Sequence, residues 1–183
     1  MRLPLLKTAL LKTTLLTTAL TCAGTLAFAA GSESQTPSTN TQSCTGGKIW
    51  DQASQSCKNP QESRFNDDQR FEAARALAFA GHYQDALMIL ATADAPEDPR
   101  ILNYTGFALR KSGETQAAMT YYRRALAADP DYNLARSYMG QALIDQGKPE
   151  AAKAQLAEIR ARGGRDTWAY ASLKHALQGK SGY

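Results

Sequence analysis

The feature of this 183-residue chain that most restricts its fold is a spacing of small and apolar residues that recurs three times. In the central copy, residues 99–132, the recurring positions are Gly106, Leu109, Gly113, Ala118, Tyr122 and Ala125. Similar residues lie 34 positions later and 32 positions earlier, with a two-residue deficit between Ala93 and Pro96. A unit of about 34 residues that recurs in this way is typical of stacked helix pairs. We therefore predict an all-α solenoid.

Small residues in each copy indicate how the two helices of a pair meet. The first helices contain Ala74, Gly106 and Gly140, where a larger side chain would push the second helix away. A glycine then follows where the first helix must end, a position that favours a left-handed backbone. These turn glycines are Gly81, Gly113 and Gly147. A final helix, residues 167–177, is predicted to cover the end of the stack.

Polar residues mark several of the predicted helix starts. Asn66, Asp98 and Asp166 precede three of the helices and are suited to cap them. The second helix of the first pair is predicted over residues 83–92. The resulting divisions are a repeat domain at residues 61–178 and a tail at residues 179–183.

The period, the turn glycines and the small crossing residues resemble the tetratricopeptide repeat. That resemblance implies three repeats plus a capping helix, arranged as a right-handed solenoid with a concave groove that binds a protein or peptide. The third repeat and the final helix, residues 129–177, are also similar to the ends of small exported tetratricopeptide proteins common in alphaproteobacteria. This second resemblance implies a periplasmic protein of assembly or scaffolding type, and it supplies no substrate.

Residues 1–29 have the features of a secretory signal peptide. Basic residues occur before an uncharged, largely apolar run at residues 15–28, and Ala27-Phe28-Ala29 gives a small-x-small cleavage pattern. We expect cleavage after Ala29 and a periplasmic or secreted location. Two alternatives remain open, namely an uncleaved membrane anchor and lipidation of Cys22.

The charge of the chain is unevenly distributed. The full sequence has 21 basic and 17 acidic residues, and loss of residues 1–29 would leave a net charge of +1. Residues 99–183 contain 13 basic and 7 acidic residues, a balance that favours an acidic partner. We expect no nucleic-acid partner, because the basic residues are dispersed along helices without a recognised nucleic-acid motif.

The segment between the signal and the repeats is predicted to be a flexible linker followed by a small hairpin. Residues 30–43 are rich in Ser, Thr and Gln and contain almost no large apolar residue to bury. Cys44 and Cys57 are then the two cysteines of the exported chain, which favours a disulfide within residues 44–60. A metal site is disfavoured, because two thiols with no nearby His supply half of a zinc shell.

The hairpin also offers a second hypothesis for function. Gly47, Trp50-Asp51, Cys57 and Pro60 are similar to the last segment of peritrophin-type chitin-binding modules. This resemblance implies a cell-envelope or carbohydrate-associated protein that contacts its target through the hairpin, with Trp50 stacked on a sugar ring. The other role open to Trp50 is to cover the disulfide or to dock on the first repeat.

No sequence pattern predicts catalysis, so we expect a protein that is not an enzyme and has no cofactor or small-molecule substrate. His82 and His175 are the two histidines, and nothing places both beside a nucleophile. There is no nucleophile elbow, phosphate-binding glycine loop or His-Glu-x-x-His pattern. The acid pairs Asp67-Asp68 and Glu97-Asp98 flank helix starts, where carboxylates stabilise the terminal amides.

The repeat resemblance places the binding groove on the first helix of each pair. The residues predicted to line it are Arg100, Asn103, Phe107, Arg110, Ser137 and Gln141. They follow helical spacing on one side, and they combine an aromatic side chain, amides and guanidinium groups that suit a protein interface. The expected ligand is an extended, partly acidic segment of another envelope protein. The alternative is that Phe107 is a core residue and the arginines are only solvated.

Overall fold

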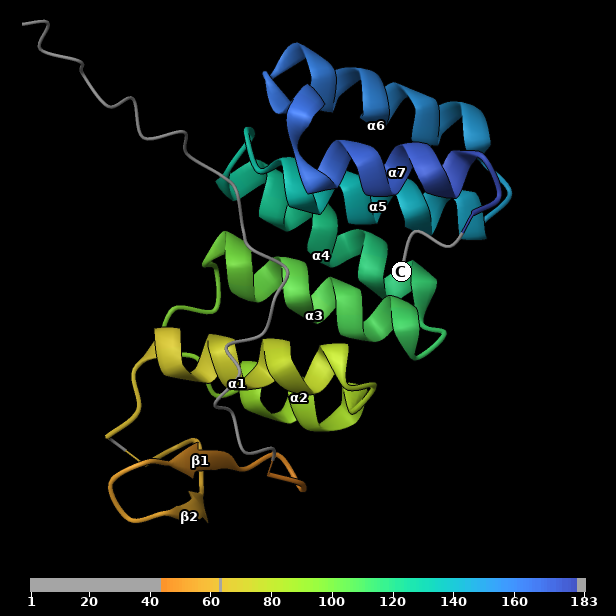
Figure 1. Cartoon of the computed structure of the whole chain (residues 1–183). Coiled ribbons are helices and arrows are strands. Elements are labelled where there is room, and N and C mark those ends of the chain that lie inside the picture. Colours follow the sequence, from red (N-terminus) through yellow and green to blue (C-terminus); the bar gives the residue numbers. More distant parts are fainter. Residues whose placement is uncertain (1–43, 63, 181–183) are drawn as a thin grey trace, which may run out of the picture.

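Figure 1 shows the computed structural model, in which antiparallel helix pairs are stacked from one end of the molecule to the other. It describes residues 44–62 and 64–180, so the predicted signal peptide, the linker and the end of the tail lie outside the described residues. The α-helices of the described residues are α1 (Asp67–Phe79), α2 (Tyr83–Leu90), α3 (Pro99–Lys111), α4 (Thr115–Ala128), α5 (Asn133–Asp145), α6 (Pro149–Ala161) and α7 (Trp168–Leu177). None of these helices is long and apolar enough to cross a membrane. The fold is the predicted all-α solenoid of three helix pairs and a final helix.

Two of the predicted helix caps are confirmed, and the third is displaced by one residue. The Asn66 side chain accepts a hydrogen bond from the amide three residues later at 2.9 Å, and Asp98 accepts one from the amide two residues later at 2.8 Å. The cap of α7 is Thr167 and not Asp166. Asp166 lies in a short 3-10 turn, Gly164–Asp166, whereas Thr167 has the extended backbone that a capping residue requires.

The turn glycines and Gly106 have the roles that the repeat pattern predicts, whereas a Cβ at Gly140 would lie 2.6 Å from Leu173 of α7 and not against the second helix of its own pair. The backbone φ is +85° at Gly81, +93° at Gly113 and +72° at Gly147, in the left-handed region that disfavours a residue with a Cβ. Gly106 lies in the middle of α3, and a Cβ there would be 2.7 Å from the Tyr122 ring of α4. The absence of a side chain at Gly106 therefore lets α4 pack closely against α3.

One hydrophobic core runs through the stack and ends under α7. Its largest fully buried side chains include Tyr104, Tyr122, Tyr138 and Phe107. Leu173 of α7 is 0 % exposed and packs into the same core. Since α7 contacts both α5 and α6, it covers the last repeat as the sequence predicts.

The second helix of the first repeat is shorter than its counterparts. α2 has 8 residues, whereas α4 has 14 and α6 has 13. The predicted helix over residues 83–92 is two residues too long, because the chain turns at Thr92, whose hydroxyl donates to the Ile89 carbonyl oxygen at 2.7 Å. The chain therefore leaves the first repeat as a loop where the other repeats continue as helix.

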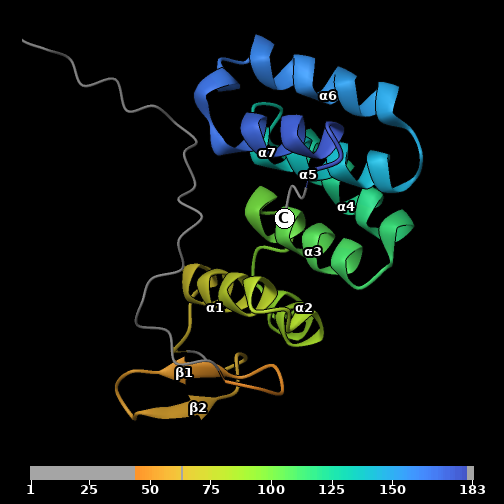
Figure 2. The same cartoon turned by 45° about the vertical axis from the view of Figure 1, so that its right-hand side comes forward.

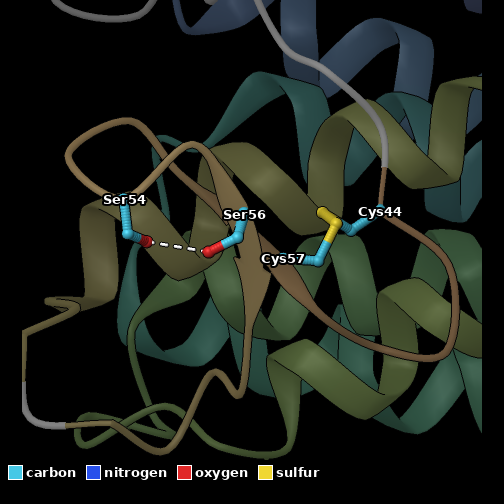
Figure 3. The surroundings of a disulfide bond; sticks show 4 residues. All are labelled: Cys44, Ser54, Ser56 and Cys57. Atoms are coloured by element: carbon cyan, nitrogen blue, oxygen red, sulfur yellow. Dashed lines mark hydrogen bonds between the residues drawn. A yellow bond between two sulfur atoms is a disulfide. The ribbon is translucent and has the colours of Figure 1, made fainter.

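The predicted hairpin is present at one end of the stack. Its strands β1 (Ile49–Asp51) and β2 (Ser56–Lys58) pair antiparallel, and Cys44 and Cys57 form the predicted disulfide (Figure 3). Figures 1 and 2 show the hairpin beside α1 and α2, at the opposite end from α6 and α7.

The hairpin shares the core of the first repeat. Ile49 is 4 % exposed and belongs to the same buried cluster as Phe65 and Phe71. The Gly47 amide donates a hydrogen bond to the Asp85 carboxylate of α2 at 3.1 Å. The hairpin thus closes one end of the solenoid, as α7 closes the other.

Candidate protein-binding surfaces

The first helices of the successive repeats lie side by side and form one face of the molecule. α3 contacts both α1 and α5, and α5 contacts α7. In Figure 1 these four helices run across the molecule one above another. We call the surface formed by α1, α3, α5 and α7 the first-helix face. The binding groove predicted from the sequence falls on it.

Four of the six residues predicted to line the groove are buried in this face. The exposed fraction is 0 % for Asn103 and Ser137, 1 % for Phe107 and 4 % for Gln141. The centroid of the Phe107 ring is 4.9 Å from that of the Tyr138 ring. These four side chains lie in the interior and do not form an open strip, because neighbouring first helices cover them. Phe107 is a core residue.

Arg100 is partly exposed, but its guanidinium group is already paired. Its Nη2 is 2.7 Å from Asp98, its Nη1 is 2.9 Å from Asp68 of α1, and the group lies 5.2 Å above the Phe71 ring. The hydrogen bond to Asp98 is the main cause that raises the pKa of Arg100. Burial would raise the pKa of the Asp98 carboxyl, but hydrogen bonds from Arg100 and its charge outweigh burial and lower it. Arg100 therefore joins α3 to the start of α1.

Arg110 joins α3 to α5, and its side chain is 7 % exposed. Its Nη1 donates to the Asp145 carboxylate at 3.0 Å, and its Nη2 donates to Gln141 Oε1 at 3.0 Å. Burial, followed by the positive charge of Arg110, lowers the pKa of the neighbouring Lys111. Both predicted groove arginines thus hold carboxylates of their own chain.

Polar groups beneath this face are only partly satisfied. Gln141 Nε2 donates to Ser172 Oγ of α7 at 3.1 Å, which links the third repeat to the final helix. Among the described residues, Asn103 Oδ1 and Ser137 Oγ are buried without a hydrogen-bond partner. Buried polar atoms of this kind are uncommon. Asn103 Oδ1 is therefore a hydrogen-bond acceptor without a donor in the described part of the chain, and it lies on α3 between Arg100 and Arg110.

A second surface, which the sequence did not predict, lies beside α2. A cleft of about 320 Å³ opens between α2, α3 and α4, and we call it the α2 cleft. Its mostly apolar lining includes Leu87, Ala91, Ile101, Thr105, Tyr121 and Arg124. The two-residue deficit of the first repeat is the signal from which it could have been predicted, since a shortened repeat leaves its neighbour less covered.

A further cleft of about 410 Å³ lies between α2 and the hairpin, and we call it the hairpin cleft. Lys48, Met88 and Ala91 are among its lining residues, and Ala91 also lines the α2 cleft, so the two clefts adjoin. Trp50, which the sequence suggested for sugar stacking, lines neither cleft and is half-buried on β1.

The residues considered for catalysis are isolated or have local structural roles. The Asp67 carboxylate accepts hydrogen bonds from the amides of Asp94 at 2.9 Å and Ala95 at 2.7 Å, so it ties the loop after α2 to the start of α1. His82 and His175 are both exposed. Within residues 44–62 and 64–180, no group of three or more His, Cys, Asp or Glu could hold a metal ion.

A stack of antiparallel helix pairs with left-handed glycine turns and a covering final helix defines an α-solenoid, a class of repeat protein. Residues 109–177 match the family model described as Tetratricopeptide repeat, so this part of the chain consists of tetratricopeptide repeats. The match runs from the end of α3 to the end of α7, and the first repeat is assigned from its helix pair and spacing. Neither a curated protein nor a solved structure matches the chain. Repeats of this family indicate a role in binding other proteins or in scaffolding.

Proposed function

We propose that this protein is an exported scaffold that binds a partly acidic segment of another envelope protein on its first-helix face. The observation that carries the proposal is that the two arginines of this face are paired with carboxylates that face water. Asp68, which pairs with Arg100, is 73 % exposed, and Asp145, which pairs with Arg110, is 47 % exposed. A ligand carboxylate can replace either one without leaving a buried charge unpaired.

The exchange of one carboxylate for another requires little free energy from the ligand. The pair of Arg100 with Asp68 is exposed, and such a pair contributes only about 0–1 kcal/mol, so its opening is a small loss. The displaced Asp145 returns to water, while the largely buried Arg110 keeps a negative partner throughout. The ligand gains charge-assisted hydrogen bonds to a guanidinium group whose position is already fixed.

The spacing of the two arginines predicts the spacing of acids in the ligand. Arg100 and Arg110 are ten residues apart on α3, which corresponds to about 15 Å along a helix. An extended chain covers about 3.3 Å per residue, so the acids should be roughly four or five positions apart.

The four buried residues of the predicted groove have a supporting role in this proposal. Phe107 packs α3 against Tyr138 of α5, and Gln141 accepts from Arg110 and orients it. Asn103 on α3 and Ser137 on α5 carry buried oxygens that have no hydrogen-bond donor among the described residues. In this proposal Gln141 positions Arg110, and none of the four residues need touch the ligand.

Export is proposed from residues 1–29 and is supported by the disulfide, which suits an oxidising compartment. Mass spectrometry of the mature N-terminus is the test. We expect a chain that begins at Ala30, and a chain that begins at Met1 or at an acylated Cys22 would contradict it.

Crosslinking capture from the native envelope fraction tests the binding surface. The double variant Arg100→Ala/Arg110→Ala should lose the partner, whereas Arg123→Ala, at an exposed position on α4, should retain it. Far-UV circular dichroism checks that each variant is folded. Capture at the wild-type level by the double variant would move the binding site off this face. Loss of capture in Trp50→Ala would instead favour the hairpin hypothesis.

A further inference from the structure

The early end of α2 leaves part of the second repeat uncovered. α2 ends at Leu90 and is six residues shorter than α4, which continues to Ala128. The chain then passes through a loop before α3 begins at Pro99. About one and a half helical turns that are present in the second repeat are therefore missing from the first.

The equivalent place one repeat later is filled by the chain itself. Leu126, in the last turn of α4, packs against the buried Leu102 and Ala135 of the neighbouring helices. The corresponding segment of the first repeat contains Asp94, which is 80 % exposed and pairs with Arg70. The α2 cleft is thus open where a helical turn with a leucine closes the next junction.

The lining of the α2 cleft suits an apolar helix face. Leu87 of α2 and Ile101 and Leu109 of α3 contribute apolar side chains, and Tyr121 of α4 adds an aromatic ring. The volume of about 320 Å³ lies at the lower end of the range of ligand pockets in proteins.

Met88 extends this apolar surface toward the hairpin. It is 48 % exposed and lines the hairpin cleft. A Cβ at Gly47 would be 2.8 Å from the Met88 Cβ and 3.0 Å from its Cε, so the hairpin backbone packs along one side of this side chain and leaves its other side in contact with water. Methionine adapts its shape to a partner and is frequent at such binding surfaces.

The charged residues that line the two clefts are both basic. Arg124 lines the α2 cleft and lies 5.2 Å above the Tyr121 ring, and Lys48 lines the hairpin cleft. Arg124 pairs with Glu97, which is 68 % exposed and which a partner carboxylate can replace. An acidic partner that replaces Glu97 therefore finds two positive charges, Arg124 and Lys48, along the clefts.

We propose that the α2 cleft binds a short amphipathic helix of a partner protein, which supplies the helical turns that α2 lacks. Leucine-like side chains of this helix enter the cleft, and a carboxylate on its flank pairs with Arg124. This is the helix-in-groove form of recognition. The site is separate from the first-helix face, so the inference goes beyond the proposed function and does not rest on it.

A designed peptide tests the inference without the natural partner. The probe is an amphipathic helix of about the length of α4, with leucines on one face and glutamates on the other, and a matched probe carries lysines in place of the glutamates. Methyl-labelled methionine gives the readout, since Met88 lines the hairpin cleft, which adjoins the α2 cleft at Ala91. Met119 is 2 % exposed and serves as a reference. We expect the Met88 signal to shift in a saturable manner while the Met119 signal does not. The glutamate probe should bind about tenfold more tightly at low salt.

Charge reversal and filling of the cleft provide the variants. Arg124→Glu should reverse the preference between the two probes, and Arg123→Glu, at its exposed neighbour, should leave it unchanged. Thr105→Trp places a large side chain in the cleft and should abolish the Met88 shift.

Three results would overturn the inference. They are an unresponsive Met88 signal in the wild-type protein, an unchanged preference in Arg124→Glu, and loss of the probe in Arg100→Ala/Arg110→Ala. The last variant removes the arginines of the first-helix face and leaves the α2 cleft unchanged. If it binds the probe as the wild-type protein does, the probe binds away from the first-helix face, and each of the two proposals can fail without the other.

Discussion

The first-helix face differs from the α2 side, by which we mean the α2 cleft and the adjoining hairpin cleft. The difference lies in how completely the side chains of each surface are paired or covered by the rest of the chain. On the first-helix face, Arg100 and Arg110 are paired with carboxylates of their own chain, and Phe107 is buried. On the α2 side, apolar side chains line a cleft, because α2 is six residues shorter than α4 and does not cover them. A repeat of full length closes its junction with the next repeat, whereas a shortened one leaves a surface that another chain can close.

The largest effect on the α2 side is expected from the disulfide, which holds the hairpin in shape beside α2. The bond closes a sequence separation of 13 residues, and its loss would cost the hairpin about 3 kcal/mol in the chain-entropy model. We expect reduction, or Cys44→Ser/Cys57→Ser, to speed hydrogen exchange around Gly47 and to preserve most of the far-UV helical signal, because each repeat contacts mainly its neighbours. A large loss of helix would show that the whole stack depends on the hairpin.

Substitutions at two adjacent residues of α3 compare the close packing between α3 and α4 with the open α2 cleft. Gly106→Leu should destabilise the protein by about 1–3 kcal/mol, because a Cβ there already lies 2.7 Å from the Tyr122 ring. Thr105 lines the α2 cleft, where a larger side chain has room. Thr105→Leu should therefore change the free energy of unfolding by no more than about 0.5 kcal/mol. Chemical denaturation measures both. If Thr105→Leu proved the more damaging, the cleft would not be open.

The two surfaces also differ in the strength of their ion pairs. Arg110→Ala should destabilise by about 1–2 kcal/mol, because the side chain is 7 % exposed and its loss leaves Gln141 without its donor. Arg124→Ala should cost clearly less than Arg110→Ala, because both partners of its pair with Glu97 are substantially exposed. Equal losses in thermal unfolding of the two variants would contradict this difference.

A smaller, pH-dependent effect is expected where Asp67 holds the loop after α2. Burial would raise the pKa of the Asp67 carboxyl, but hydrogen bonds from the Asp94 and Ala95 amides and from Arg70 outweigh burial and lower it. A carboxyl with a lowered folded-state pKa stabilises the protein above its unfolded pKa and loses this contribution as the pH falls, below about pH 4.

Thermal melts at neutral and acid pH check the role of Asp67. The wild-type protein should lose more stability on acidification than Asp67→Asn does. Glu150→Gln removes a carboxylate that is 80 % exposed and should leave the wild-type pH dependence in place. If Asp67→Asn showed the same pH dependence of stability as the wild-type protein, the Asp67 carboxylate would not be the source of that dependence.

Features set by local sequence were predictable. The turn glycines, the caps at Asn66 and Asp98, and the disulfide follow from residue types that suit one local geometry. The cap of α7 was misplaced by one residue, because a 3-10 turn that no strong sequence signal announces precedes it.

Burial on the first-helix face could not be predicted in the same way. Helical spacing places Asn103 and Phe107 on one side of α3, but whether that side is open depends on how closely α1 and α5 approach. The pairing of Arg110 with Asp145 joins residues 35 apart, and no periodic position of the repeat predicts it. The shortness of α2 was visible only as the two-residue deficit, and its consequence depended on the positions of α3 and α4.

Carboxylate exchange on the first-helix face is tested most directly by removal of the internal competitors. Asp68→Asn/Asp145→Asn leaves Arg100 and Arg110 in place without their exposed acidic partners. The affinity of this variant for the partner captured from the envelope should rise by roughly threefold to tenfold. That ratio corresponds to the free energy of a weak ion pair that the ligand no longer has to break. An affinity equal to or below that of the wild-type protein would contradict carboxylate exchange at these two arginines.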